Sequence, residues 1–310
     1  MRDFTGKTAF ITGGASGAGL GQAKVFAAAG ARVVIADIRQ DAIDAALAEL
    51  RALGATAHGI QLDITDRAAF ARAADETESV FGPVDLLFNT AGVSIFGPLE
   101  KASYDDYDWI FGVNIGGVVN SMQTFVPRMI AAGRGGHIVN TASLGAFVAG
   151  STSGIYSASK FAVHGISMAM RDALKGHDIG VSVLCPANIR SNIAESVKTR
   201  PAHLSDSGYA VDERELEALR EIYAQGMDPE ELAGHVKEAI EENRFYIIPY
   251  PEARAMLQAT FQQVIDALPP EESDAEGQAK RHAAMVRYQE ARREMDSARY
   301  AEASPVASND

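Results

Sequence analysis

Short apolar runs alternate with longer segments of helical periodicity in the first part of the chain. Four apolar runs rich in β-branched residues precede residue 90, at 8–12, 31–36, 57–62 and 84–88. Three segments with a helical pattern separate them, at 17–30, 41–54 and 66–81. Strands that are apolar on both faces and alternate with helices are typical of a parallel sheet covered by helices on both sides. The pattern therefore predicts an α/β fold.

The alternation continues as far as residue 184 and then loosens. It is extended by a helix at 103–132, a strand at 137–140, a helix at 153–176 and a strand at 181–184. Further on, Asp228 and Pro229 are typical of a helix start, and 245–250 fits another strand. The sequence thus predicts a Rossmann-type doubly wound parallel sheet of about seven strands with helices on both faces.

The same pattern predicts how the chain is divided. We expect a domain at 1–250, a helical C-terminal extension at 251–300 and a disordered tail at 301–310. The extension is charged and is expected to pack on the domain or on a partner subunit. Residues 188–226 are polar and mixed, with one helical candidate at 212–223. A long irregular segment at this place is more often a lid or binding element than a linker, so we expect a substrate loop.

Length and composition narrow the class of protein. A chain of 310 residues with 47% hydrophobic composition can bury a substantial core. No apolar run approaches the roughly 18 residues that span a bilayer, and no signal-like segment precedes the first strand, so no membrane association is expected. Cys185 is the only cysteine, which excludes an internal disulfide and makes the cytoplasm the expected compartment.

Charge and histidine spacing argue against two further classes of partner. The formal net charge of −13 disfavours binding to nucleic acid or anionic lipid. The seven histidines show neither i,i+4 pairing nor cysteine neighbours. Dispersed histidines of this kind do not predict a metal site, so we expect no metal ligands.

A glycine-rich loop follows the first strand. Residues 12–19 fit the pattern T-G-x-x-x-G-x-G and lie directly before the first helix. Glycines permit a tight turn and let a pyrophosphate approach backbone N–H groups at the helix N-terminus. We therefore expect a nucleotide cofactor at this loop, held by Gly13, Ser16, Gly17, Ala18 and Gly19.

Asp37, at the end of the second strand, bears on which cofactor binds. A carboxylate there can accept hydrogen bonds from both hydroxyls of an adenosine ribose and would repel a 2′-phosphate, which favours NAD over NADP. Arg39 lies two residues further on and could bind a 2′-phosphate, stack on adenine or remain solvated. The cofactor predicted from these residues is NAD.

The third and fourth strands also end in residues suited to a cofactor. Asp63 and Ile64 end the third strand, where they can meet the adenine; Asp63 fits the N-cap of the next helix equally well. Asn89, Ala91 and Gly92 follow the fourth strand, where small residues allow a close approach. Since the carboxyl ends of parallel strands share one sheet edge, we expect these residues to converge there.

Tyr156 and Lys160 stand four residues apart, with Ser143 thirteen residues upstream of the tyrosine. That spacing places the tyrosine and the lysine on one helix face. A lysine charge near a phenol favours the phenolate, so we expect a lowered tyrosine pKa and a role as general base. A Tyr-x-x-x-Lys pair on a solvated helix is common, and the motif alone is weak.

Several motifs taken together resemble the short-chain dehydrogenase/reductase family over residues 5–250. They comprise 12–19, 89–92, Asn114, Ser143, Tyr156-x-x-x-Lys160 and Pro186. The resemblance implies that Tyr156 is the general acid/base, that Lys160 holds the nicotinamide ribose and that Ser143 binds the reacting oxygen. It also implies that Asn114 supports a water in a proton relay. Pro186, Ile189 and Ser191 would contact the cofactor, and the chain departs from the family pattern at Ala18, Thr90 and Ala187.

Longer stretches resemble the bacterial Cα-dehydrogenases of lignin β-aryl ether breakdown. They lie at 104–114, 125–143, 186–195 and 245–252. This resemblance implies NAD-dependent oxidation of the benzylic secondary alcohol of guaiacylglycerol-β-guaiacyl ether to the ketone. Candidate substrate contacts, each of which also fits a core position, are Ile95, Phe96, Phe147, Asn188, Tyr209 and Tyr223.

Other functions compatible with these motifs stay open. The same site suits another secondary alcohol or ketone, such as a steroid, a polyol or a small aryl ketone. A non-catalytic NAD-binding regulator would keep the fold without needing the set Ser143, Tyr156 and Lys160. The family resemblance also implies a homodimer or homotetramer formed by the long helices at 103–132 and 153–176.

Overall fold

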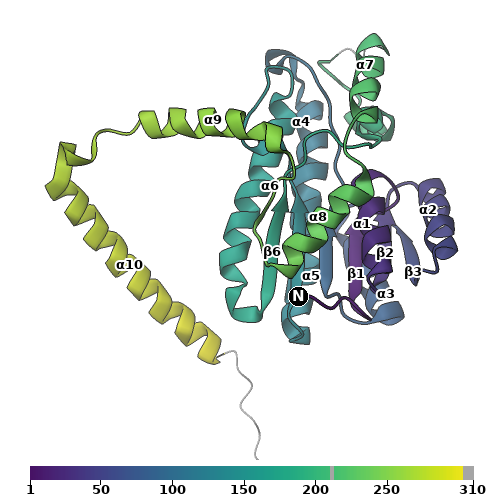
Figure 1. Ribbon diagram of the computed structural model, residues 1–310, viewed down its shortest axis with the longest axis horizontal. Helices are drawn as coiled ribbons and strands as arrows, with labels where there is room; N and C mark the ends of the chain where they lie inside the picture. The colour runs from purple at the N-terminus through teal and green to yellow at the C-terminus, as the bar shows by residue number, and fades with distance from the viewer. Residues whose placement is uncertain (210–212, 303–310) are drawn as a thin grey trace, which may run out of the picture. The chain divides into compact units, whose positions relative to one another are not determined.

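The computed structural model describes residues 1–209 and 213–302. All strands of these residues form one parallel sheet in the order β3-β2-β1-β4-β5-β6-β7 (Figure 1). The strands are β1 (Thr8–Thr12), β2 (Arg32–Asp37), β3 (Ala57–Gln61), β4 (Leu86–Asn89), β5 (Gly136–Thr141), β6 (Ile179–Leu184) and β7 (Tyr246–Ile247). The Rossmann-type fold predicted from the pattern is confirmed. The strand order reverses between β1 and β4, and open α/β sheets bind ligands at such a point.

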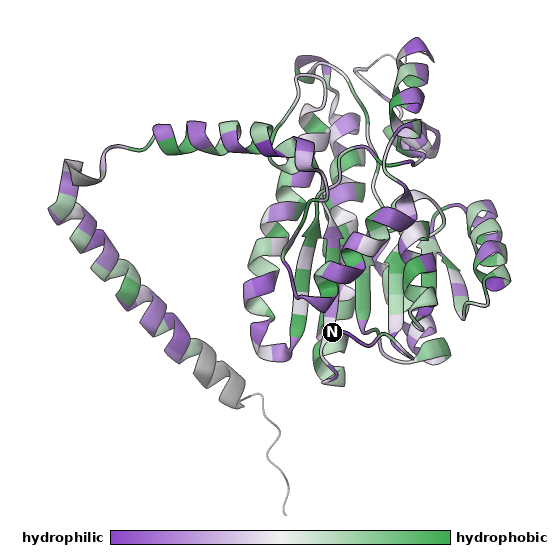
Figure 2. Cartoon of the chain, viewed as in Figure 1, coloured by the Kyte–Doolittle hydropathy of each residue, from purple (hydrophilic) through white to green (hydrophobic). Residues whose placement is uncertain are grey.

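Helices cover both faces of this sheet. Those of the main body are α1 (Gly17–Ala28), α2 (Gln40–Ala52), α3 (Arg67–Phe81), α4 (Tyr104–Phe111), α5 (Gly117–Ala132), α6 (Gly154–Ala173), α7 (Glu213–Ala224) and α8 (Pro229–Glu241). In Figure 2 the strands are mostly hydrophobic, whereas hydrophobic and hydrophilic residues alternate along the helices. Each face of the sheet therefore has its own core.

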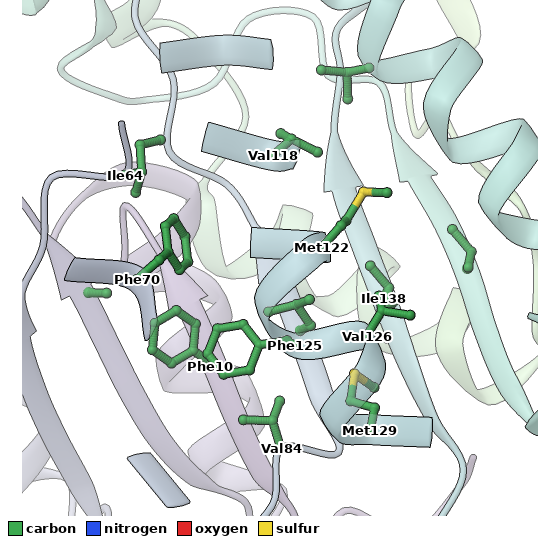
Figure 3. Close-up of a cluster of buried hydrophobic side chains, with 14 of the residues drawn as sticks. Phe10, Ile64, Phe70, Val84, Val118, Met122, Phe125, Val126, Met129 and Ile138 are labelled. Atoms are coloured by element: carbon green, nitrogen blue, oxygen red, sulfur yellow. The ribbon is translucent and has the colours of Figure 1, made fainter. Parts of the chain in front are cut away.

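Alternate residues of β1 enter the two cores. Phe10 lies in the cluster under α3, α5 and α6, whereas Ala9 and Ile11 lie in the cluster under α1, α2 and α8. Figure 3 shows the first cluster, in which the ring centroid of Phe10 lies 4.5 Å from that of Phe125 and 6.4 Å from that of Phe70. Burial of this kind contributes about 25 cal/mol per Å² of apolar surface, which holds the carboxyl ends of the strands in register.

Two predicted elements differ from the structure. The strand expected at 245–250 is only the short β7, because Pro249 has no N–H to donate to the ladder. The long helix expected at 103–132 contains a π-helical turn at Gly112–Gly116, between α4 and α5.

The chain divides into two compact units, Met1–Leu257 and Gln258–Asp310. The boundary lies inside α9 (Arg254–Asp266), a few residues beyond the predicted end of the domain. The second charged helix is α10 (Ala275–Glu302), so residues 301 and 302 of the expected tail are helical and 303–310 lie outside the described residues. No helix in the described part of the chain is long and apolar enough to cross a membrane.

Candidate active site

The glycine loop forms a turn that only glycine can occupy at two positions. Gly13 has φ +65°, and a Cβ there would lie 2.8 Å from the Cα of Ala91. A Cβ at Gly19 would come within 2.1 Å of the carbonyl oxygen of Gly13. Ser16, the N-cap of α1, makes no capping hydrogen bond with its side chain. The first N–H groups of α1 therefore face a narrow cradle suited to a phosphate.

A cavity of about 800 Å³ lies at the carboxyl edge of the sheet and joins this loop to the tyrosine. The reaction candidates Ser143, Tyr156 and Lys160 line it. Cofactor candidates that line it are Gly13, Ser16, Gly17, Ala18, Gly19, Asp37, Arg39, Asp63, Ile64, Ala91, Gly92, Pro186, Ile189 and Ser191. The fold thus brings most of the predicted site to one place.

Two acidic residues at strand ends adopt local turns beside the cavity. The Oδ1 of Asp37 accepts a hydrogen bond of 3.2 Å from the backbone N–H of Arg39. The Oδ1 of Asp63 accepts from both the N–H and the hydroxyl of Thr65, at 2.9 and 2.7 Å. The alternative that Asp63 caps the next helix is wrong, because Asp66 occupies that position and accepts from two backbone N–H groups.

Asn114 lies in the π-helical turn and is fully buried. Its Oδ1 accepts a 2.8 Å hydrogen bond from the N–H of Val93, and its Nδ2 donates to the carbonyl of Val93 and to the hydroxyl of Ser159, each at 3.0 Å. The side chain does not line the cavity, but its Oδ1 would lie 3.2 Å from a Cβ at Gly92. The Nζ of Lys160 would lie 3.3 Å from the same point, so both residues adjoin one stretch of backbone.

The reaction candidates are held by backbone groups of neighbouring strands. The Nζ of Lys160 donates to the carbonyl of Thr141 at 3.0 Å and lies 5.5 Å from the centroid of the Tyr156 ring. The hydroxyl of Ser143 accepts from the N–H of Gly145 at 3.0 Å and donates to the carbonyl of Pro186 at 3.3 Å. These contacts fix a hydroxyl, a phenol and an amine around one part of the cavity.

The electrostatics differ from the prediction of a lowered tyrosine pKa. Burial raises the pKa of Tyr156, and hydrogen bonding with Ser143 opposes that effect only in part. Burial also lowers the pKa of Lys160 to about 8. Removal from water disfavours the charged form of both groups, and it is the largest cause of both shifts.

Besides Asn114, four candidate residues do not line the cavity. The Nδ2 of Asn89 donates to the Oδ1 of Asn140 at 2.8 Å, so this side chain ties β4 to β5. The ring of Phe147 lies 4.9 Å from that of His164. Ile95 and Tyr209 belong to a buried apolar cluster with Trp109, Ile110 and Ile155. In the structure Asn89 therefore links two strands, and the other three side chains pack against neighbouring side chains.

The other three substrate candidates, Phe96, Asn188 and Tyr223, do line the cavity. The sequence did not single out further lining residues, which include Trp109, Leu144, Ser153, Asn192, Ile193, Ser196, Lys198, Thr199, Pro201, His203 and Leu204. Most of them belong to the polar segment 188–226, which was the only signal of their role. The way in which these side chains point depends on two short 3-10 turns, Ile193–Thr199 and Ala202–Leu204. No periodic pattern in the sequence indicates such turns.

Comparison with known proteins finds both a family and close relatives. A family model described as short chain dehydrogenase matches residues 7–202. A C alpha-dehydrogenase of Sphingobium sp. strain SYK-6 is 55% identical over 287 residues, covering 92% of this chain and 94% of the relative. A 1-deoxy-11-beta-hydroxypentalenate dehydrogenase of Streptomyces exfoliatus is 33% identical over 274 residues, covering 87% of this chain and 93% of the relative.

Solved structures agree with these matches. The apo form of LigD from Sphingobium sp. strain SYK-6 is similar with a TM-score of 0.74 and 50% identity, over 86% of this chain and 100% of that chain. A short-chain dehydrogenase/reductase from Burkholderia phymatum in complex with NAD has a TM-score of 0.83 and 34% identity, over 88% of this chain and 99% of that chain.

Proposed function

Because the chain belongs to the short-chain dehydrogenase family, we propose that it oxidises the benzylic secondary alcohol of a lignin-derived β-aryl ether to the ketone, with NAD as acceptor. Guaiacylglycerol-β-guaiacyl ether is the model substrate. The observation that carries the proposal is the single cavity in which the glycine loop meets Ser143, Tyr156 and Lys160. The substrate rests on the 55% identical C alpha-dehydrogenase, which matches nearly the whole chain.

The cavity residues fit a dinucleotide. The cradle at Gly13 and Gly19 leaves no room for a Cβ, and Asp37 stands where a ribose would be held. When bound there, the nicotinamide ring supplies the carbon that accepts the hydride. NAD is preferred over NADP because the carboxylate of Asp37 would repel a 2′-phosphate.

The side chains of this chain would handle the proton. The hydroxyl of Ser143 and the oxygen of Tyr156 bind the alcohol oxygen. Tyr156, once it has given its own proton to the relay, takes the alcohol proton as a phenolate while the hydride leaves the carbinol carbon. The charge of Lys160, 5.5 Å from the ring centroid, stabilises the phenolate once it forms. Asn114, next to Lys160 at Gly92, supports the water that passes the proton onward.

The aromatic character of the cavity supports an aryl substrate. The ring centroid of Phe96 lies 6.4 Å from that of Tyr156. Trp109, Leu204 and Tyr223 add apolar or aromatic surface. Aromatic rings of a substrate would pack against such side chains with about 0.5–1.5 kcal/mol beyond the burial of area.

One experiment tests substrate, cofactor and stereoselectivity together. The protein is incubated with NAD and each stereoisomer of guaiacylglycerol-β-guaiacyl ether in turn, and NADH absorbance is followed. We expect turnover with at least one isomer and a loss of about 10²–10⁴ in rate for Tyr156→Phe. Tyr104→Phe, at a tyrosine whose side chain is 89% exposed, is the matched control. A Tyr156→Phe enzyme with near-normal turnover would end the mechanism.

Two alternatives have distinct outcomes in this assay. Turnover of a steroid, a polyol or a small aryl carbinol without turnover of the ether would assign the site to another secondary alcohol. Binding of NAD without turnover of any carbinol would indicate a regulator. The cavity favours an enzyme, because a regulator has no need of Tyr156, Lys160 and Ser143 together at one cavity.

A further inference from the structure

Two segments that are far apart in the sequence form one wall of the cavity. Trp109 of α4 lines the cavity, as do Thr199, Pro201 and Leu204 of the segment 188–226. Leu204 packs against the buried cluster that contains Trp109. Arg200 lies between two lining residues in the sequence but does not line the cavity itself. The side chain of Arg200 instead points away from the cavity, toward the residues behind this wall.

Behind the wall, Arg200 is paired with a fully buried carboxylate. The Nη1 of Arg200 donates to the Oδ1 of Asp106 at 2.6 Å, and the two side chains are 10% and 0% exposed. Asp106 is in the first turn of α4 and forms a capping box with Ser103. Its carboxylate also accepts from the hydroxyl of Ser207 at 2.8 Å and from the N–H of Gly208 at 3.0 Å. One carboxylate thus holds both the start of α4 and the segment at 200–208.

Arg200 extends the same network to the wall itself. Its guanidinium lies 5.2 Å from the centroid of the Trp109 ring. Its Nε donates to the carbonyl of Leu204, and its Nη2 donates to that of Asp206 at 3.0 Å. A single side chain therefore contacts the tryptophan on one segment and closes the 3-10 turn that carries Leu204 on the other.

The surroundings of Asp106 favour its ionised form. Burial acts to raise the pKa of Asp106, but hydrogen bonds from Ser103, Arg200, Ser207 and Gly208 outweigh it and hold the pKa below its ordinary value. A planar guanidinium that bonds a carboxylate, two carbonyls and an aromatic face cannot be replaced by lysine without losing some of these contacts.

We propose that Arg200 is a positioning residue that, through Asp106, fixes the wall formed by Trp109 and the segment 199–204 and so sets which sizes of alcohol bind productively. The inference rests on the proposed oxidation of an aryl alcohol. A one-ring alcohol needs only the space beside Ser143 and Tyr156. A two-ring β-aryl ether must occupy more of the cavity, so it depends on the wall.

Steady-state kinetics on three variants test this role. The substrates are guaiacylglycerol-β-guaiacyl ether and 1-phenylethanol, each with saturating NAD, and the KM for NAD is measured separately. We expect Arg200→Met to raise the KM for the two-ring ether about tenfold, with kcat for 1-phenylethanol and the KM for NAD within about twofold of wild type. Arg200→Lys should give a smaller shift of the same kind. Arg244→Met removes an exposed arginine that pairs with Glu242 and is the matched control.

The outcomes separate this inference from the proposed function. An equal rise in KM for both alcohols, or no rise for either, would show that Arg200 has only a structural role. If Arg200→Met does not fold, as judged by circular dichroism, the selectivity of Arg200→Lys decides the question in the same way. A wild-type protein that oxidises neither alcohol overturns the proposed function and this inference with it.

Discussion

At the residue scale, Tyr156 and Lys160 are neighbouring groups whose charged forms are each disfavoured by removal from water. Burial raises the pKa of the phenol and lowers that of the ammonium to about 8. Lys160 is therefore an amine whose charge changes close to neutral pH, and it lies beside the tyrosine that we propose as the base.

The pKa of Lys160 predicts how stability depends on pH. In the folded chain this pKa is about 8, against 10.5 for the unfolded chain, so the unfolded state binds more protons between these values. The destabilisation by Lys160 is fully present below pH 8 and fades as pH rises towards 10.5. We expect the unfolding free energy of wild type, measured relative to Lys160→Met, to rise by about 2 kcal/mol from pH 7.5 to 9.5.

Urea unfolding at the two pH values measures this difference directly. Lys175→Met, at a lysine side chain that is 72% exposed, is the control and should show the same pH dependence as wild type. A difference between wild type and Lys160→Met that is constant with pH would mean that Lys160 titrates at its ordinary value.

Asp37 predicts the choice of cofactor. The carboxylate lines the cavity at the end of β2, and its loss removes the repulsion of a 2′-phosphate while Arg39 remains. We expect Asp37→Ala to raise the NADP/NAD ratio of kcat/KM by about tenfold or more. Asp41→Ala, on an exposed turn of α2, is the control. An unchanged ratio in Asp37→Ala would contradict the assignment of NAD.

At the element scale, the π-helical turn between α4 and α5 explains how Asn114 reaches Val93. The wider turn places the amide against the backbone that follows β4, where it satisfies both the N–H and the carbonyl of Val93. Such turns are often found at functional sites. The element is therefore a structural clamp on the cavity rim as well as a candidate part of the proton relay.

Removing this clamp should affect both stability and rate. Asn114→Ala leaves two buried backbone groups of Val93 without their partner, which costs about 1–3 kcal/mol for each group that stays unsatisfied. We expect a lower free energy of unfolding in urea and a lower kcat, with the KM for NAD changed less. Gln40→Ala, an exposed amide paired with Asp44, should change neither. Normal kcat in a destabilised Asn114→Ala enzyme would leave the residue with a structural role alone.

The sequence predicted those elements whose signal is local. Apolar runs predicted six of the strands, and the spacing around Tyr156 predicted a site. Each of these signals lies within one strand or one helix, so the local sequence contains it. The shortness of β7 depends on proline, and the π-helical turn has no periodic signal. The Asp106–Arg200 pair joins residues 94 positions apart, and no local pattern reports such a contact. The contact of Phe147 with His164, seventeen residues further on, has no local signal either, and Phe147 does not line the cavity.

At the scale of the whole molecule, the unit Met1–Leu257 contains both cores and the whole cavity. Its sheet reverses order between β1 and β4, which places the glycine loop beside the strands that carry Asn89 and Ser143. This supports the proposed division into a catalytic domain and a helical extension.

The second unit should accordingly be dispensable for folding. Both cores and the cavity lie within Met1–Leu257, and Leu257 itself packs against the core of that unit. A chain ending at Leu257 should therefore unfold in urea within about 1 kcal/mol of the full chain and bind NAD equally well. A chain ending at Glu242, which lacks β7, is the control and should be strongly destabilised because β6 loses one of its two partner strands.

The family resemblance implies a homo-oligomer. Sedimentation velocity on the chain ending at Leu257 tests which surface forms it. Phe161 and Met168 lie seven residues apart on α6, which is two helical turns, and they are 45% and 50% exposed. Apolar side chains exposed along one face of a long helix are suited to pairing with a second copy. We therefore expect the chain ending at Leu257 to keep the subunit number of the full chain, and Phe161→Lys to reduce it. A truncated chain that falls to a monomer would instead assign the association to the extension, where Phe261, Val264, Ile265 and Leu268 are also exposed.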